Sequence, residues 1–186
     1  MGWSNLHECK ILEKIILTNN LYQYQFPPFD NQSFGFNIYA LINGSEALLI
    51  DTAFENHAKA VLEDLEKEGV EIKQVVFSHF HPDHISGLPV LNSPTLYGNG
   101  SYQESLNKYT PIDKHHYFSD VNILSEASKL TFGQFEMQFK LIKGHVICGL
   151  FTIINNKFIH VADDLMASNE GVPLLPSVHI SNVKEH

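Results

Sequence analysis

The most informative stretch of this chain is Ser78-His79-Phe80-His81-Pro82-Asp83-His84, which places three imidazoles and a carboxylate directly after an apolar run. That run, residues 72–77, is typical of a strand covered on both faces. Side chains two positions apart in an extended segment point the same way, so His79 and His81 can face one point. Pro82 suits a turn or a first helical residue, so Asp83 and His84 should approach from another direction.

This stretch predicts a site for two neighbouring metal ions. Neutral imidazole and carboxylate are the usual ligands of zinc, with iron and manganese as other occupants, and no cysteine lies within the stretch. The competing interpretation is a surface loop that happens to be rich in histidine. Four potential ligands that follow an apolar strand without interruption favour the metal site.

Two later pairs extend the pattern. Gly144-His145 follows an expected strand, and the glycine lets the backbone bend so that the imidazole can face back towards the cluster. Ala162-Asp163 ends another expected strand. In this order the motifs resemble those of the metallo-β-lactamase superfamily of metallohydrolases, and the resemblance covers residues 15–165.

The resemblance implies an α/β fold, the αββα four-layer sandwich of that superfamily, incomplete at its C-terminus. It divides the ligands between two metal ions: His79, His81 and His145 for the first, Asp83 and His84 for the second, and Asp163 bridging the two. Asp163 is preferred because a small residue precedes it, as in the Gly-Asp pair of the family, and Asp164 is the fallback.

The resemblance leaves one ligand without a match. Members of the superfamily continue through a helix and a strand to a final histidine, and here residues 170–176 are expected to form a loop. His179 is one candidate, although the neighbouring prolines restrict it. The alternatives are a shortened chain, a ligand from a partner chain and a second site completed by water.

Composition limits the class of protein. The 186 residues suit a single domain, residues 1–186, and a formal net charge of −9 argues against nucleic acid as a partner. Cys9 and Cys148 are too few for a disulfide framework, and each is expected to be a buried free thiol, although Cys148 could instead lie beside the metals. Without an apolar run of about 18 residues or a signal peptide, we expect a soluble, cytoplasmic protein that does not bind membranes and could self-associate.

Periodicity and turn residues predict the elements between these motifs. Asn19-Asn20, Asn43-Gly44 and Asn155-Asn156 are suited to tight hairpin turns. Expected strands are 13–18, 21–26, 34–42, 46–51, 72–77, 95–97, 121–124, 129–132, 135–142, 150–154 and 157–162, with helices over 56–67 and 100–108, a short helix or turn over 85–89, and a loop over 109–120.

Several residues have two interpretations. Phe26, Phe29 and Phe34 surround a loop that could either lie over the metals and grip an apolar part of the substrate or cover the edge of the core. Residues 114–117, Lys-His-His-Tyr, could contact an anionic substrate or form a solvated loop. Asp51 resembles the aspartate that supports the metal-binding loop in the superfamily, or it caps a helix. His160 lies three positions before Asp163, so strand parity predicts that it faces the core on the opposite side.

The expected activity is hydrolysis of a small-molecule ester, thioester or lactone by a hydroxide held between two divalent metals, most readily Zn²⁺, with Fe or Mn possible. Asp83 is the expected catalytic residue, because its carboxylate can orient that hydroxide and carry a proton to the leaving group. Rival hypotheses are a mononuclear iron oxygenase that uses His79, His145 and Asp163, a metal-binding regulatory module with little turnover, and a diiron domain linked to a flavin domain.

Overall fold

A computed structural model describes residues 11, 13–30, 34–167 and 173–174 of the protein. Its larger sheet has the strand order β1-β2-β3-β4-β5-β6-β7. Neighbouring strands are antiparallel from β1 to β4 and parallel from β4 to β7. The strands are β1 (Glu13–Thr18), β2 (Leu21–Phe26), β3 (Phe36–Asn43), β4 (Glu46–Ile50), β5 (Glu71–Val76), β6 (Thr95–Asn99) and β7 (Val121–Leu124).

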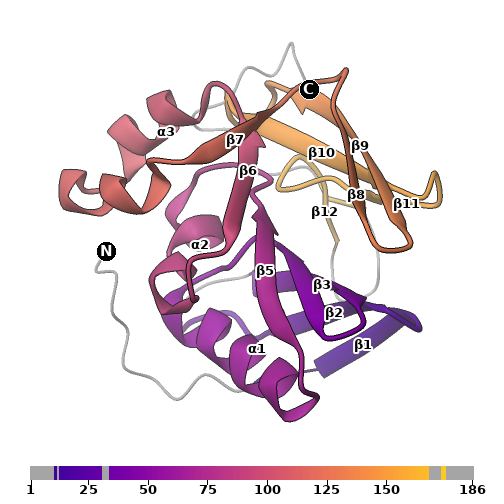
Figure 1. Ribbon diagram of the computed structural model, residues 1–186. Coiled ribbons are helices and arrows are strands. Elements are labelled where there is room, and N and C mark those ends of the chain that lie inside the picture. The colour runs from indigo at the N-terminus through magenta and orange to yellow at the C-terminus, as the bar shows by residue number, and fades with distance from the viewer. Residues whose placement is uncertain (1–10, 12, 31–33, 168–172, 175–186) are drawn as a thin grey trace.

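Helices cover one face of this sheet (Figure 1). They are α1 (Glu55–Lys67), α2 (Pro82–Ile85) and α3 (Tyr102–Tyr109), with the 3₁₀ helices η1 (Leu88–Val90) and η2 (Ile112–Phe118). Val61 and Leu65 of α1 are fully buried, and they belong to the same apolar cluster as Ile38 and Val75 of the sheet. The amphipathic spacing of α1 thus fastens the helix to the sheet.

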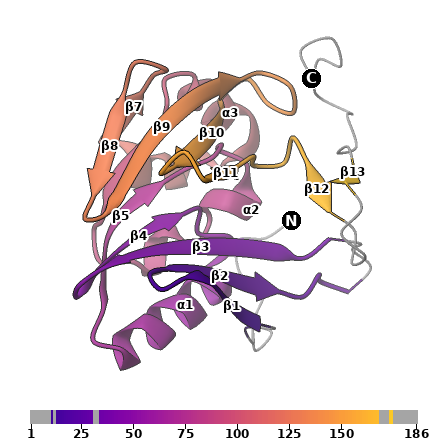
Figure 2. The same cartoon turned by 90° about the vertical axis from the view of Figure 1, so that its right-hand side faces the viewer.

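A second, antiparallel sheet lies against the other face of the larger one (Figure 2). Its order is β11-β10-β9-β8, formed by β8 (Lys129–Phe132), β9 (Phe135–Ile142), β10 (Gly149–Ile154) and β11 (Phe158–His160). Leu41 and Ile50 of the first sheet join Phe139 and Leu150 of the second in one buried cluster. A further pair, β12 (Met166–Ala167) and β13 (Pro173–Leu174), is antiparallel.

The α/β class and the sandwich are therefore confirmed, and the described residues form its helix, sheet and sheet layers. The turns at Asn19-Asn20 and Asn155-Asn156 are confirmed, and Asn155 and Asn156 both have φ of 52°, as a type I′ hairpin turn requires. The turn expected at Asn43-Gly44 lies one residue later, at Gly44-Ser45, because Asn43 still pairs with Glu46. Two other expectations were wrong in detail. Residues 112–118 form η2 instead of a loop, and residues 173–174 pair as β13 within the expected loop. No helix among the described residues is long and apolar enough to cross a membrane.

Candidate metal centre

The C-terminal end of β5 delivers the histidine stretch to one edge of the sandwich. His81 is still extended, with φ of −81° and ψ of 151°, and it stands at the N-cap of α2, whose first residue is Pro82. The proline therefore turns the chain as expected. His79 is completely buried, whereas His81 and His84 are half-buried.

The first group of possible ligands is His79, His81 and His145, whose nearest nitrogens all lie within 4.8 Å of one another. His145 comes from the connection between β9 and β10, and its Nε2 lies 3.1 Å from Nδ1 of His81. The backbone N–H of His145 donates to Oδ1 of Asp164 at 3.0 Å. Asp164, the fallback ligand, thus holds the backbone of a ligand instead.

The second group is His79, His84 and Asp163. Oδ1 of Asp163 lies 3.3 Å from Nε2 of His84, while its Oδ2 lies 3.8 Å from Nε2 of His145. The carboxylate therefore turns one oxygen towards an imidazole of each group. Asp83 belongs to neither group, and its Oδ2 lies 3.9 Å from Nε2 of His84.

A buried carboxylate and hydroxyl hold the imidazoles from behind. Oδ1 of Asp51 accepts the backbone N–H of Ser78 at 2.8 Å, and Oδ2 accepts the Ser78 hydroxyl at 2.6 Å and Nδ1–H of His84 at 2.7 Å. Because the Ser78 hydroxyl donates to Asp51, its oxygen can accept from Nδ1–H of His79, which lies 3.2 Å away. Both bonds direct an Nε2 lone pair away from Asp51 and into the cluster.

The aspartate thus supports the site, as the superfamily resemblance implied, and it does not cap α1, whose N-cap is Phe54. Asp51 adopts a φ of 62°, and Ala53 a φ of 50°. The strained turn is held by the backbone N–H of Thr52, which donates to the carbonyl of His84 at 2.8 Å. Asp51 is only 1 % exposed, so it acts entirely through its neighbours.

Burial and charge separate the four histidines into two kinds. Burial lowers the pKa of His79 well below its ordinary value and that of His81 to about 3, and it also lowers the pKa of His145. Burial would lower the pKa of His84 too, but the carboxylates of Asp163, Asp51 and Asp83 raise it well above its ordinary value. The first group is therefore neutral and ready to donate lone pairs.

Asp163 is the negatively charged partner of His84. Burial would raise its pKa, but the neighbouring His84 holds it far below the ordinary value. Without a cation, His84 and Asp163 form an ion pair, and His84 gives up its Nε2 proton when that nitrogen serves as a ligand.

The residues present fit a divalent cation. Nε2 of His79, the ring nitrogen that is not turned to Ser78, is buried and has no hydrogen-bond partner among the described residues. Leaving a buried nitrogen without a partner is costly, and a bound metal ion would remove that cost. Nitrogen and carboxylate donors without thiolate suit zinc, iron or manganese.

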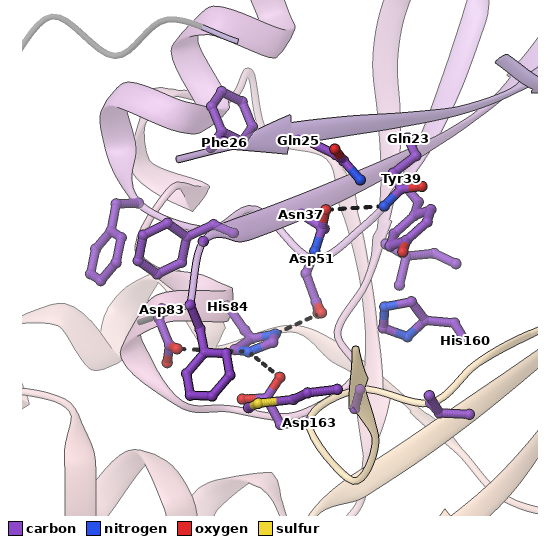
Figure 3. Close-up of a pocket in the computed structure, with 18 of the residues that line it drawn as sticks. Gln23, Gln25, Phe26, Asn37, Tyr39, Asp51, Asp83, His84, His160 and Asp163 are labelled. Atoms are coloured by element: carbon purple, nitrogen blue, oxygen red, sulfur yellow. Dashed lines mark hydrogen bonds and ion pairs between the residues drawn. The ribbon is translucent and has the colours of Figure 1, made fainter. Parts of the chain in front are cut away.

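The cluster opens into a cavity of about 1720 Å³ between the two sheets (Figure 3). Asp83, His84 and Asp163 line it, whereas His79, His81 and His145 do not. Tyr109 also lines the cavity, and its ring meets the ring of His81 edge-on with centroids 4.5 Å apart. No pattern in the sequence signals this contact, because it depends on how the end of α3 is placed against α2.

The aromatic residues of the 26–34 loop divide between the two interpretations. Phe26 and Phe34 line the cavity, and Phe34 is 48 % exposed. Phe29 packs against Phe36, Phe54 and the buried ring of His57, and so it covers the edge of the core.

The 114–117 segment and the cysteines also had two interpretations. Residues 114–117 do not line the cavity, and His115 instead contacts the carbonyls of Leu106 and Thr110. Cys148 is a fully buried free thiol 3.0 Å from Oγ of Ser105, as expected, while Cys9 and His179 lie outside the described residues.

The prediction for His160 was wrong. It lines the same cavity as Asp163, because β11 ends at His160 and Ala162 adopts a φ of 48°, so strand parity does not extend to position 163. Figure 3 shows both side chains at the cavity.

The sequence profile of the metallo-β-lactamase superfamily matches residues 35–172. The chain belongs to the metallo-β-lactamase superfamily. Among curated proteins it is similar to a hydroxyacylglutathione hydrolase of Haemophilus ducreyi, with 25 % identity over 118 residues, which are 60 % of this chain and 48 % of that protein. The match thus spans about half the length of this relative.

Solved structures share the fold. The metallo-β-lactamase IND-7 has a TM-score of 0.74 at 18 % identity, over 94 % of this chain and 81 % of that one. A flavoprotein from Thermotoga maritima has a TM-score of 0.63 at 17 % identity, over 88 % of this chain and 46 % of that one. At these identities the likeness concerns the fold alone.

Proposed function

We propose that this member of the superfamily is a dinuclear metal-dependent hydrolase of a small-molecule ester, thioester or lactone. The observation that carries the proposal is the position of Asp163, whose Oδ1 lies 3.3 Å from Nε2 of His84 in one ligand group and whose Oδ2 lies 3.8 Å from Nε2 of His145 in the other. The similarity to a hydroxyacylglutathione hydrolase, by its name a hydrolase, supports the reaction class. Zinc is the preferred occupant on donor chemistry, with iron or manganese as substitutes.

Different residues of the chain would bind the cations and transfer the proton. His79, His81 and His145 would hold one cation, and His84 would hold the second, with Asp163 between them. Bound cations supply a water that is deprotonated near neutral pH and a centre that polarises a carbonyl. The side chain of Asp83 is 40 % exposed and lines the cavity, so its carboxylate can hold a proton and pass it to a leaving group.

The first test measures metal content and turnover together. Purified protein should contain close to two divalent ions per chain by elemental analysis, and it should hydrolyse at least one substrate from a panel of thioesters, lactones and aryl esters. His81→Ala should lose metal and nearly all turnover, because it removes a nitrogen that faces His145 at 3.1 Å. Asp83→Asn should retain more metal than activity, since Asp83 lies outside both ligand groups.

Different results would point to the rival functions. A single iron per chain together with substrate-dependent consumption of O₂ would replace the hydrolase with an oxygenase. Two bound metals without turnover on any substrate of the panel would favour a regulatory module. Full activity in His81→Ala would refute the site assignment. Asp120→Asn, an exposed change far from the cluster in sequence, is the control.

A further inference from the structure

One wall of the cavity is a patch of four uncharged polar side chains on β2 and β3. Gln23 and Gln25 alternate along β2, and Asn37 and Tyr39 alternate along β3, so each pair shares a face. The strand register sets Gln23 opposite Tyr39 and Gln25 opposite Asn37. All four line the cavity, where Figure 3 shows them above Asp51.

The patch lies where the space between the sheets opens to solvent, since Asn37 is exposed and Gln23, Gln25 and Tyr39 are half-buried. It lies on the face of the first sheet that turns towards the second, and further along the same strands Leu21 and Leu41 fill that face as part of the buried inter-sheet cluster. Burial raises the pKa of Tyr39, so the patch stays neutral over the ordinary pH range.

Two amides in the patch are hydrogen-bonded to each other. Nε2 of Gln23 donates to Oδ1 of Asn37 at 3.1 Å. This bond leaves the Gln23 carbonyl oxygen as an acceptor and the Asn37 amino group as a donor, and neither has a partner among the residues that the structure describes. A free acceptor and a free donor in one patch together complement a secondary amide, which offers one N–H and one C=O.

His160 faces the patch from the other sheet. Its ring meets the ring of Tyr39 with centroids 5.1 Å apart and an interplanar angle of 78°. Nδ1 of His160 is buried and has no hydrogen-bond partner in the described part of the chain. Burial lowers the pKa of His160, so this nitrogen belongs to a neutral ring that needs a polar partner.

The patch adjoins the metal centre. Tyr39 is paired across the strands with Ile50, and the next residue is Asp51, which holds His84. One small molecule can therefore reach both places within the cavity. We propose that Gln23, Gln25, Asn37 and Tyr39, with His160 opposite them, form a subsite for a neutral amide of the substrate. The compound hydrolysed is then an ester, thioester or lactone that carries a secondary amide, an assignment of substrate class that rests on the proposed function.

The test compares substrates that differ only in the amide. In the first pair the amide is on the thiol side: S-acyl-N-acetylcysteamine thioesters are compared with S-pentyl thioesters of the same acyl group. In the second pair it is on the acyl side: N-acylglycyl thioesters are compared with alkanoyl thioesters of equal length. Asn37→Leu should lower kcat/KM for the amide-bearing member of at least one pair roughly tenfold, the usual effect of one lost hydrogen bond, and leave its amide-free partner unchanged. If Asn37→Leu folds poorly, Tyr39→Phe replaces it as the test variant, because it removes only a hydroxyl group.

Gln138→Leu is the matched control. Nε2 of Gln138 donates to Oδ1 of Asn156 at 3.4 Å, so the same kind of amide pair is lost on an exposed surface outside the cavity. This control should leave every substrate ratio unchanged. Equal loss for both members of each pair, or no loss at all, would overturn the subsite and leave the hydrolase proposal intact.

A binding measurement separates this proposal from failure of the hydrolase. N-ethylacetamide is titrated into the full chain while the side-chain amide signals of Gln23 and Gln25, which are present in every variant, are followed by NMR. Shifts that saturate, and that vanish in Tyr39→Phe or Asn37→Leu, support the subsite even if no thioester is cleaved. Shifts of the same size in both variants and in the wild type would refute it.

Discussion

Replacing Asp51 by asparagine tests how the metal centre is held. The carboxylate accepts three hydrogen bonds, from the backbone N–H and the hydroxyl of Ser78 and from Nδ1–H of His84. An amide can present an oxygen on only one side. If its oxygen keeps the Ser78 N–H, its amino group faces His84, which must then carry its proton on Nε2, 3.3 Å from Asp163. The lone pair that would bind a cation is lost.

The expected loss follows from these contacts. Changing the residue that orients a ligand histidine typically weakens metal binding by about 10- to 100-fold, or roughly 1.4–2.7 kcal/mol. The metal-free protein should also lose stability, about 2–4 kcal/mol, because hydrogen bonds to a buried charge are replaced. Backbone strain adds little, since asparagine tolerates the left-handed φ of 62° better than most residues.

Two measurements on the same preparation decide the outcome. Zinc affinity is read by titration against a chromogenic competitor, and the free energy of unfolding is read by urea denaturation without metal. Asp120→Asn changes an exposed carboxylate and should alter neither quantity. Zinc affinity within threefold of wild type in Asp51→Asn would refute the reasoning about the orientation of His84.

Three further outcomes are expected. Burial lowers the pKa of His57 to about 4, so its contribution to stability is lost as pH falls from about 6.5 towards 4, by up to roughly 3 kcal/mol. His57→Leu should therefore make that part of the urea-derived stability curve less steep. Gly87→Ala should cost about 1–3 kcal/mol by thermal unfolding, because its Cβ would meet backbone and side-chain atoms at under 3 Å, while Gly100→Ala, with its nearest contact at 3.3 Å, should cost little. Burial raises the pKa of Cys148, so after Cys9→Ser the remaining thiol should react with iodoacetamide only at the rate of unfolding, and fast labelling of the native protein would contradict its burial.

The sequence could predict what is encoded locally. The bend at Pro82 and two of the three hairpin turns depend on residues within a few positions of one another, and there the predictions agree with the structure. The helix α1 was predicted for the same reason, because its apolar positions recur on one face. The convergence of His145 and Asp163 on the cluster followed from the family resemblance, since no local pattern could show it.

Features that depend on register or on distant packing were missed. The pairing of Gln23 with Asn37 requires the alignment of β2 with β3, and the contact of Tyr109 with His81 requires the position of α3. The 3₁₀ helix η2 is polar and short, so it has no periodicity to detect. His160 was misplaced because the parity rule assumes a regular strand, and β11 ends at that residue.

The two sheets meet beside the ligand cluster, where the backbone N–H of Leu150 in β10 donates to the carbonyl of Ser78 at 2.8 Å. Residues 79–84 belong to the first sheet's side of this junction, and His145 and Asp163 belong to the second sheet's side. A bound ion would therefore act as a cross-link between segments about 60 to 80 positions apart, and it would favour the folded state in proportion to its free concentration. Removing the metal with EDTA should then speed amide hydrogen exchange on β10 and β11 before it affects β2 or β3. The contact between the two sheets beside the ligand cluster would be the first part of the fold to open.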